Sequence, residues 1–218
     1  MKKLSMLFLT LALVGAGCSQ TAEQVVEVEE IVLEVVDPIV IELQDGEYAI
    51  DSSVSKVGWA AEKVTRQGHI GEIVISAGDL VVENGKISSG SVVIDIATIK
   101  SLDLVDEKLE TLVTHLKSED FFFVEEYPTS KFVFTSLDPN NDGSWSVTGD
   151  LTMREITRGV TFPVVIDSAE DSVHLTGTST IDRTNWGVNA QSGKFFASLG
   201  DNVVKDDVDL TLDVTWTK

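Results

Sequence analysis

In the stretch Ser91-Val92-Val93-Ile94-Asp95-Ile96, apolar and polar side chains alternate. Because successive side chains of a strand point to opposite faces, Val92, Ile94 and Ile96 share one face, and Ser91, Val93 and Asp95 share the other. Most segments after Tyr48 repeat this pattern, which is typical of antiparallel strands that are buried on one face and wet on the other. Further strands are expected over residues 57–64, 70–76, 132–134, 145–147, 160–166, 173–181 and 208–216.

Turn signals separate these stretches. Glu83-Asn84-Gly85-Lys86 lies between two segments rich in valine and isoleucine, and Asn-Gly is a strong hairpin signal. Asn140-Asn141-Asp142-Gly143 separates two aromatic stretches in the same way. The chain is therefore expected to run as successive antiparallel hairpins.

One segment has a helical period instead. Apolar residues recur every three or four positions with charged residues between them, which predicts an amphipathic helix of about four turns capped by Ser101 or Asp103. The apolar positions are Leu102, Val105, Leu109, Leu112, Val113 and Leu116. So many antiparallel strands with a single helix must form a sandwich or a closed barrel to manage the sheet edges. We expect an all-β antiparallel barrel with the helix over one opening.

The N-terminal 17 residues have the features of a secretory signal, with Lys2 and Lys3 before a short apolar run that ends in small residues. The run is too short for a transmembrane helix, which needs about 20 apolar residues. Its end resembles the lipobox of bacterial lipoproteins, so Cys18, the single cysteine, is the expected lipidation site. The alternative is an ordinary signal peptide that leaves an idle thiol. Ser19 stands where a retention aspartate holds many lipoproteins in the inner membrane, which favours the outer membrane, facing the periplasm.

Residues 18–45 form a lipidated N-terminus and an acidic segment without lysine or arginine between Thr21 and Asp45. Like charges favour an extended tether, whereas the apolar residues 39–43 could instead add a strand to the folded domain, 46–218. The formal net charge of −20 makes nucleic acid a poor partner. Membrane attachment is therefore expected through the acylated cysteine and not through a basic patch.

A set of short motifs, in order, resembles the YceI-like family of lipid-binding proteins. The motifs are Tyr48-Ala49-Ile50-Asp51 with Ser55 and Trp59, His69-Ile70-Gly71, Gly90-Ser91 leading to Ile94-Asp95, residues 115–122, Tyr127-Pro128, Lys131-Phe132, residues 149–158, Asp182-Arg183 and Trp186-Gly187. The resemblance implies a lipocalin-like barrel that holds a polyisoprenoid, a quinone-like lipid or a similar amphiphile. Glu155 departs from the family, which usually has glycine there, so it would be strained in a turn of positive φ.

The expected lipid-binding residues are apolar and lie on inward strand positions or in expected loops. They are Trp59, Ile94, Phe132, Phe134, Leu151, Phe162, Trp186, Phe195 and Phe196. The alternation is equally consistent with side chains that fill a small solid barrel, and the loop aromatics could plug its ends. Arg183 is a candidate for an anionic head group, or it pairs with a nearby acid such as Asp182 or Asp201.

The sequence gives little support for a catalytic or a metal-binding function. His69, His115 and His174 are far apart and lack zinc-ligand spacing, and no nucleophile elbow or phosphate loop occurs. The loop from Asp138 to Gly143 matches only the first half of a calcium loop, so a hairpin is the better interpretation. We expect a non-enzymatic lipid carrier, store or sensor without a cofactor or metal, and a homodimer is possible. The alternative is a solid structural barrel that binds a partner protein.

Overall fold

The computed structural model describes residues 43–65 and 67–218. Cys18 and the predicted tether up to residue 42 lie outside this part of the chain, so the lipidation site and the two alternatives for the tether stay predictions. The described elements are β1 (Gly46–Ile50), β2 (Lys56–Glu62), β3 (Gly68–Glu83), β4 (Lys86–Ser101), α1 (Asp106–Lys117), β5 (Thr129–Pro139), β6 (Trp145–Met153), β7 (Ile156–Ala169), β8 (Ser172–Asp182), η1 (Arg183–Trp186), η2 (Gly200–Asn202) and β9 (Asp207–Thr217).

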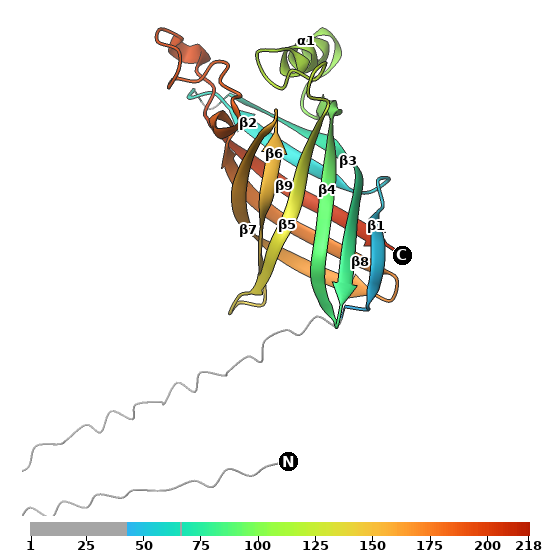
Figure 1. The fold of residues 1–218 in the computed structure, drawn as a ribbon. Coiled ribbons are helices and arrows are strands. Elements are labelled where there is room, and N and C mark those ends of the chain that lie inside the picture. The colour runs from blue at the N-terminus through green and yellow to red at the C-terminus, as the bar shows by residue number, and fades with distance from the viewer. Residues whose placement is uncertain (1–42, 66) are drawn as a thin grey trace, which may run out of the picture. The chain divides into compact units, whose positions relative to one another are not determined.

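The strands close into an antiparallel barrel, as predicted (Figure 1). Each strand from β3 to β8 pairs with the next one along the chain, and β2 pairs with both β3 and β9 to complete the circle. Closure gives every strand of this circle a neighbour on both sides, which limits strand-to-strand aggregation.

β1 and β2 occupy the same place in the circle, one after the other. Both pair with β3 and β9, but β1 faces Asp79 to Val82 of β3 while β2 faces residues 68–74. The turn between them stays anchored to β9 because the hydroxyl of Ser55 donates to the carbonyl of Thr215 at 3.2 Å and accepts from its amide at 2.9 Å. Because β1 and β2 share one position between β3 and β9, the nine described strands form a barrel of eight strand positions.

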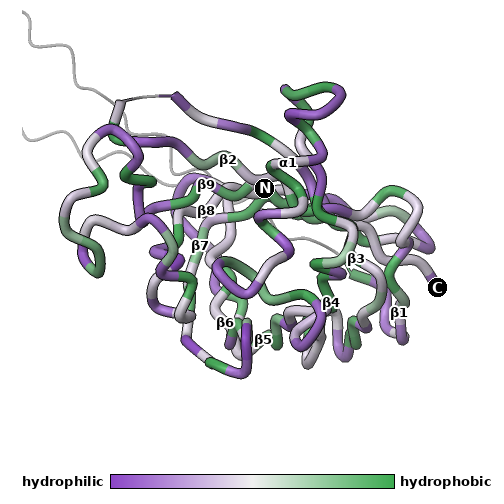
Figure 2. The backbone as a smooth tube through the Cα atoms, turned by 90° about the horizontal axis from the view of Figure 1, so that it is seen from above, coloured by the Kyte–Doolittle hydropathy of each residue, from purple (hydrophilic) through white to green (hydrophobic). Residues whose placement is uncertain are grey.

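Side-chain burial alternates along the long strands, as the sequence pattern predicts. In β3, Ile73, Ile75, Leu80 and Val82 are buried, and Figure 2 shows hydrophobic and hydrophilic positions mixed along the strands. A β-bulge within β3 and β4 shifts the register between Ile75 and Ala77 and so keeps both halves of the strand facing inward. The core of the protein is therefore the barrel interior.

The predicted hairpins are confirmed. Asn84 and Gly85 connect β3 to β4 with positive φ at both residues, the geometry of a type I′ turn. The segment between β5 and β6 is a hairpin loop closed by hydrogen bonds between Asn140 and Ser144. Arg154 and Glu155 also have positive φ, at 49° and 62°, so the glutamate does stand in a backbone conformation that favours glycine.

The helix is shorter than predicted, and its predicted caps are wrong. α1 has 12 residues, about three turns, and its N-cap position is Val105, which makes no side-chain cap. Ser101 is the last residue of β4 and donates to Asp103 at 2.8 Å, while Asp103 accepts from His69 and from the amide of Ile70. Both predicted caps are thus engaged with the sheet.

α1 lies at one end of the barrel, together with segment 187–206, at the top of Figure 1. None of its residues is fully buried, and its Leu112 and Leu116 pack against a cluster formed by Trp59, Ile73, Ile96 and Ile99 of β2, β3 and β4. Within the described residues, no helix has the length and apolarity needed to cross a membrane. The helix therefore borders the open end of the barrel without filling its core.

Candidate functional site

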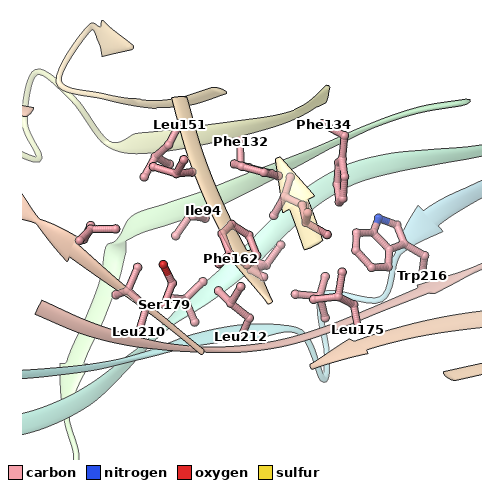
Figure 3. Close-up of a pocket in the computed structure, with 17 residues that line it drawn as sticks. Ile94, Phe132, Phe134, Leu151, Phe162, Leu175, Ser179, Leu210, Leu212 and Trp216 are labelled. Carbon is pink, nitrogen blue, oxygen red and sulfur yellow. The ribbon is translucent and has the colours of Figure 1, made fainter. Parts of the chain in front are cut away.

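The middle of the barrel holds an apolar cavity of about 80 Å³, here called the core cavity (Figure 3). Its 17 lining residues come from β2 to β9, and Ser179 carries the one hydroxyl among them. Five of the predicted lipid-binding residues lie in this wall, namely Ile94, Phe132, Phe134, Leu151 and Phe162. The inward strand positions thus meet around open space.

Aromatic rings form one side of the core cavity. The ring of Phe132 lies 5.2 Å from that of Phe134 and 5.6 Å from that of Phe162, and Phe134 lies 6.2 Å from Trp216. Gly149 of the neighbouring β6 makes this packing possible, since a Cβ there would lie 2.3 Å from the Phe132 ring. Glycine on one strand therefore creates the room for a large ring on the next.

A second apolar space, the helix-side cavity, lies at the end of the barrel next to α1 and has a volume of about 110 Å³. Leu116, Phe121 and Phe122 close it toward the helix. It shares several wall residues with the core cavity, namely Val57, Ile94, Leu151, Ile181 and Leu210. Because these residues border both spaces, the two cavities are neighbours inside one apolar interior.

An outer groove reaches the helix-side cavity from the surface. It runs between α1, β2 and the segment that contains Gln191 and Val204. Trp59, Ala61, Leu116 and Phe121 line both the groove and the helix-side cavity. These shared residues mark the boundary between the barrel interior and the groove.

Trp59 is held at this boundary by a glycine on the adjacent strand. Gly71 of β3 pairs with Trp59 of β2, and a Cβ on Gly71 would lie 2.4 Å from the indole ring and 2.0 Å from the carbonyl oxygen of Lys100. The bare backbone lets the indole lie flat against β3, where its side chain is 8% exposed. The motif residues Trp59 and Gly71 therefore form one packing unit.

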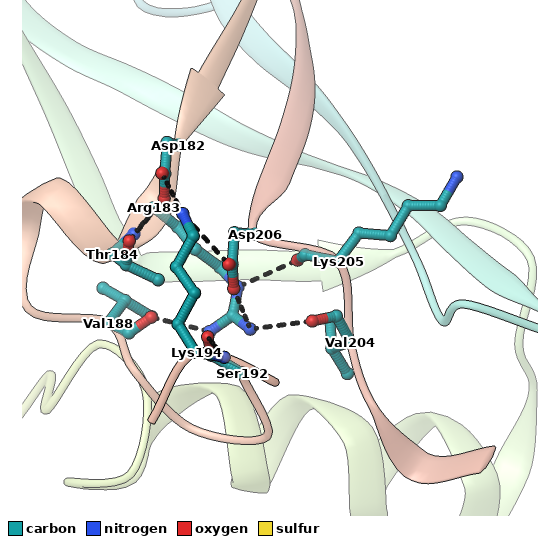
Figure 4. Close-up of polar contacts among 9 residues, drawn as sticks. All are labelled: Asp182, Arg183, Thr184, Val188, Ser192, Lys194, Val204, Lys205 and Asp206. Atoms are coloured by element: carbon teal, nitrogen blue, oxygen red, sulfur yellow. Dashed lines mark hydrogen bonds and ion pairs between the residues drawn. The ribbon is translucent and has the colours of Figure 1, made fainter. Parts of the chain in front are cut away.

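Arg183 lies between segment 187–206 and the helix-side cavity, and it is 5% exposed (Figure 4). Its guanidinium donates to the carbonyl oxygens of Val188, Val204 and Lys205 at 2.6, 3.3 and 3.2 Å. Burial lowers the pKa of Arg183, against the opposing effect of the nearby carboxylates. The contacts identify Arg183 as the group that fastens segment 187–206 to the barrel end.

The acid that pairs with Arg183 is Asp206, at 3.7 Å, so the predicted partners Asp182 and Asp201 are wrong. Lys194 bridges Asp182 and Asp206, at 2.7 and 3.2 Å. The Phe121 ring lies 5.8 Å from the guanidinium. Arg183 therefore has its charge balanced within the protein, which is the alternative of pairing with a nearby acid and not that of binding an anionic head group.

The loop aromatics divide into two groups. Trp186 is buried, and its indole N–H donates to the carbonyl oxygen of Leu151 at 2.9 Å, but its side chain borders neither cavity. Phe195 and Phe196 are 53% and 49% exposed and line none of the three spaces described above. The structure thus places Trp186 as a plug of the barrel end and leaves the other two on the surface.

Each histidine pairs with an acid: His69 with Asp103 at 2.9 Å, His115 with Asp120 at 3.4 Å and His174 with Asp213 at 2.9 Å. These three pairs lie on different elements. Among residues 43–65 and 67–218, no group of three His, Cys, Asp or Glu side chains could hold a metal ion.

The family model of the YceI-like domain matches residues 48–216 of this chain. The chain belongs to the YceI-like family. This result confirms the resemblance found in the motifs. The matched range runs from Tyr48, the first residue of those motifs, to Trp216 near the end of β9.

This YceI-like protein is similar in sequence to UPF0312 proteins and in fold to solved structures of low sequence identity. A UPF0312 protein of Pseudomonas putida is 34% identical over 80 residues, which cover 34% of this chain and 42% of that protein. BcnA of Burkholderia cenocepacia has 21% identity and a TM-score of 0.59, over 76% of this chain and 98% of its own. A structure described as a polyisoprenoid binding domain from Saccharophagus degradans has 10% identity and a TM-score of 0.59, over 78% and 97%. The chain thus spans less than half of the P. putida relative.

Sequence reasoning missed several wall residues of this YceI-like barrel. Val57 and Ile181 border both cavities, and Ser130 lines the helix-side cavity with a fully buried hydroxyl. The strand period could have placed the first two on inward faces. Nothing local distinguishes Ser130, because a serine near the start of a strand is ordinary.

Proposed function

We propose that this protein binds a polyisoprenoid or a similar long-chain amphiphilic lipid inside the barrel, as a carrier, store or sensor in the cell envelope. The single observation that carries the proposal is the pair of neighbouring apolar cavities, one of which adjoins an outer groove. The polyisoprenoid binding domain from S. degradans, a barrel of the same fold, is named for the same class of ligand.

Burial alone can supply the affinity. Each CH₂ group hidden from water contributes about 0.8 kcal/mol, so a chain of several prenyl units needs no strong polar contact along its length. The core cavity offers such a chain an almost purely apolar wall, with Ile94 and Leu151 common to both spaces. The free space inside the barrel favours this proposal over a solid barrel that only binds a partner protein.

The ligand proposal is tested by purifying the protein from its own membranes in mild detergent. Native mass spectrometry and solvent extraction should both recover lipid in stoichiometric amount, with a prenyl or other long alkyl chain. Recovery of no lipid, together with a crystal structure in which side chains fill the interior, would contradict it.

The envelope part of the proposal rests on the sequence around Cys18. An acylated cysteine anchors a protein stably when it carries more than one chain, so the barrel would bind lipid locally, within reach of residues 18–45. Cys18→Ser should move the protein from the membrane fraction to the soluble fraction while its thermal unfolding is unchanged. A Cys18→Ser variant that stays with the membranes would contradict the anchor but not the lipid site.

A further inference from the structure

β4 and β5 separate before either strand ends. Their pairing covers residues 91–95 of β4 and 129–133 of β5. The residues that extend the two strands beyond this region, 86–90 of β4 and 134–139 of β5, do not pair with each other, and within the described part of the chain each set pairs only with its other neighbour, β3 or β6. Figure 1 shows the two strands apart at the end of the barrel away from α1. The wall therefore has a gap at this end, here called the β4–β5 gap.

Two β-bulges account for the separation. The register between β3 and β4 shifts at Ser88, which lies between the paired residues Ile87 and Ser89. The register between β5 and β6 shifts at Thr135 in the same way. A bulge bends its strand and increases the local twist, so the two strands diverge beyond these residues. Each strand is left with an edge of unpaired backbone groups, and such an edge is a template for another strand.

Apolar side chains beside the gap are incompletely covered. Ile87, Phe134 and Leu137 pack against the barrel core but are only partly buried, whereas Val82, the partner of Ile87 on β3, is completely buried. On the outer face, Val133 is 40% exposed at the point where the gap begins. A strand of alternating apolar residues in the gap would therefore find apolar neighbours on both faces.

The chain itself supplies such a strand next to the gap. Leu43, the first described residue, packs in the barrel core, and its carbonyl oxygen would lie 3.8 Å from a Cβ on Gly85, in the turn that precedes β4. The carboxylate of Asp45 accepts from the amide of Gly85 at 2.8 Å. Shortly before Leu43 comes the run Ile39-Val40-Ile41, which consists of the β-branched residues that strands favour. Pro38 fits the first position of a strand, where no ladder donor is needed.

The reach of the chain and its charge also fit the gap. From Glu42 to Gly46, where β1 begins, four residue steps span at most about 14 Å. β1, β3 and β4 lie side by side, so a strand beyond β4 would be three strand spacings from β1, about 14 Å along the wall and less across the barrel opening. Lys86 and Lys131 border the gap and form no ion pair among the described residues. They can therefore pair with the carboxylates of Asp37 and Glu42.

We propose that residues 38–42 form an added strand in the β4–β5 gap, antiparallel to β4, which starts beside Gly90 and ends beside Lys86. This placement does not depend on the proposed lipid ligand. It has a consequence for the tether, because the chain before Pro38 then leaves the side of the barrel in the direction of α1. A membrane anchor at Cys18 would thus hold the outer groove, which α1 borders, closer to the membrane than a tether that leaves from the opposite end.

Amide hydrogen exchange, followed by mass spectrometry on full-length protein in mild detergent, tests the added strand. In the wild type, the amides of residues 86–90 and 134–138 that face the gap should exchange slowly, because a partner strand bonds to both edges. Val40→Pro removes an amide donor and places a ring in the strand, so exchange in both segments should become at least about tenfold faster. Val28→Pro is the matched control, since it makes the same change in the tether outside the strand. Its exchange should stay within about twofold of wild type.

The paired residues 173–176 of β8 and 213–216 of β9 lie away from the gap and serve as an internal reference, so their exchange should be the same in all three proteins. Fast exchange at both edges in the wild type, or slow exchange that Val40→Pro leaves unchanged, would overturn the added strand. An equal loss of protection in Val28→Pro would overturn it by assigning the contact to another part of the tether. Protection that disappears when the protein is diluted would overturn it in favour of a second copy of the chain.

Discussion

Nη1 of Arg183 donates a hydrogen bond to the carbonyl oxygen of Val188 at 2.6 Å, and this bond joins η1 to the segment that follows it. The same guanidinium reaches Val204 and Lys205 near the other end of segment 187–206. One buried side chain thus ties both ends of a long irregular segment to the barrel.

Arg183→Met should lower the free energy of unfolding by about 3–5 kcal/mol, because it leaves three carbonyls in a buried region without their donor and Asp206 with Lys194 as its remaining cation. Urea denaturation followed by far-UV circular dichroism measures the loss. Arg158→Met is the control, since the exposed Arg158 donates only to its neighbour Thr157, and it should change stability by less than about 0.5 kcal/mol. Similar losses in both variants would show that Arg183 does not fasten the segment.

Ile94→Phe should reduce the lipid recovered per protein by at least half. Ile94 borders both cavities, so the larger ring occupies space that the chain needs. Because that space is empty of protein atoms, the cost in stability should stay under about 1.5 kcal/mol, below that of overpacking a filled core. Lipid extraction and thermal unfolding provide the two measurements.

The control for this substitution is Ile70→Phe, the same change at a position that is 51% exposed. It should leave both the recovered lipid and the stability unchanged. If Ile94→Phe unfolds the protein and Ile70→Phe does not, the interior is filled and the cavity interpretation is wrong.

The carboxylate of Asp103 should stabilise the fold at all pH values except strongly acidic ones. Burial raises the pKa of Asp103, but hydrogen bonds from His69, Ser101 and the amide of Ile70 outweigh this effect and lower it from 3.8 to about 2. A group with a lowered pKa in the folded state stabilises the fold above its unfolded pKa and loses this contribution as the pH falls through the folded value. The loss therefore falls between pH 3.8 and about 2.

Asp103→Asn should remove this dependence. Wild type should lose on the order of 1 kcal/mol more than the variant over that pH range, a value reduced from the full shift because the carboxylate is partly exposed. Urea unfolding at a series of pH values gives the comparison. Parallel curves for the two proteins would contradict the role of the hydrogen bonds to Asp103.

Glu155→Gly should stabilise the protein by about 1 kcal/mol, because Glu155 has a φ of 62° that a residue with a Cβ adopts at a cost. The midpoint of thermal unfolding should rise by about 2–4 °C. Glu170→Gly is the control: Glu170 also lies in a two-residue hairpin turn, between β7 and β8, but it is not among the residues of positive φ. Glycine there should destabilise slightly, so a rise in both midpoints would exclude backbone strain as the cause.

Most of the wall of the barrel could be predicted because its signals are local. Alternation over six residues identifies the inward face around Val92 and Ile94, and Asn84-Gly85 identifies a turn from two residues. The start of the helix could not be predicted in this way. Asp103 looks like a cap in sequence, but His69, 34 positions away, takes its carboxylate, and no local pattern contains that contact.

The candidate site was predictable in part for the same reason. The period along the strands placed Phe132, Phe134 and Phe162 on inward faces, and in the structure these faces line the core cavity. Phe195 and Phe196 have no period to place them, and segment 187–206 leaves them exposed. The partner of Arg183 depends on how that segment folds back, which brings Asp206 closer than Asp182 or Asp201.

By itself the sequence determined the class of the fold and the family, because strand period, turn residues and motif order are properties of neighbouring residues. It left open whether inward apolar side chains fill the barrel or surround a space, since both arrangements need the same alternation. Only the tertiary structure decided this. The volume that remains inside depends on how rings such as Phe132 fit against Gly149 across strands, and on how Trp59 lies over Gly71 at the mouth.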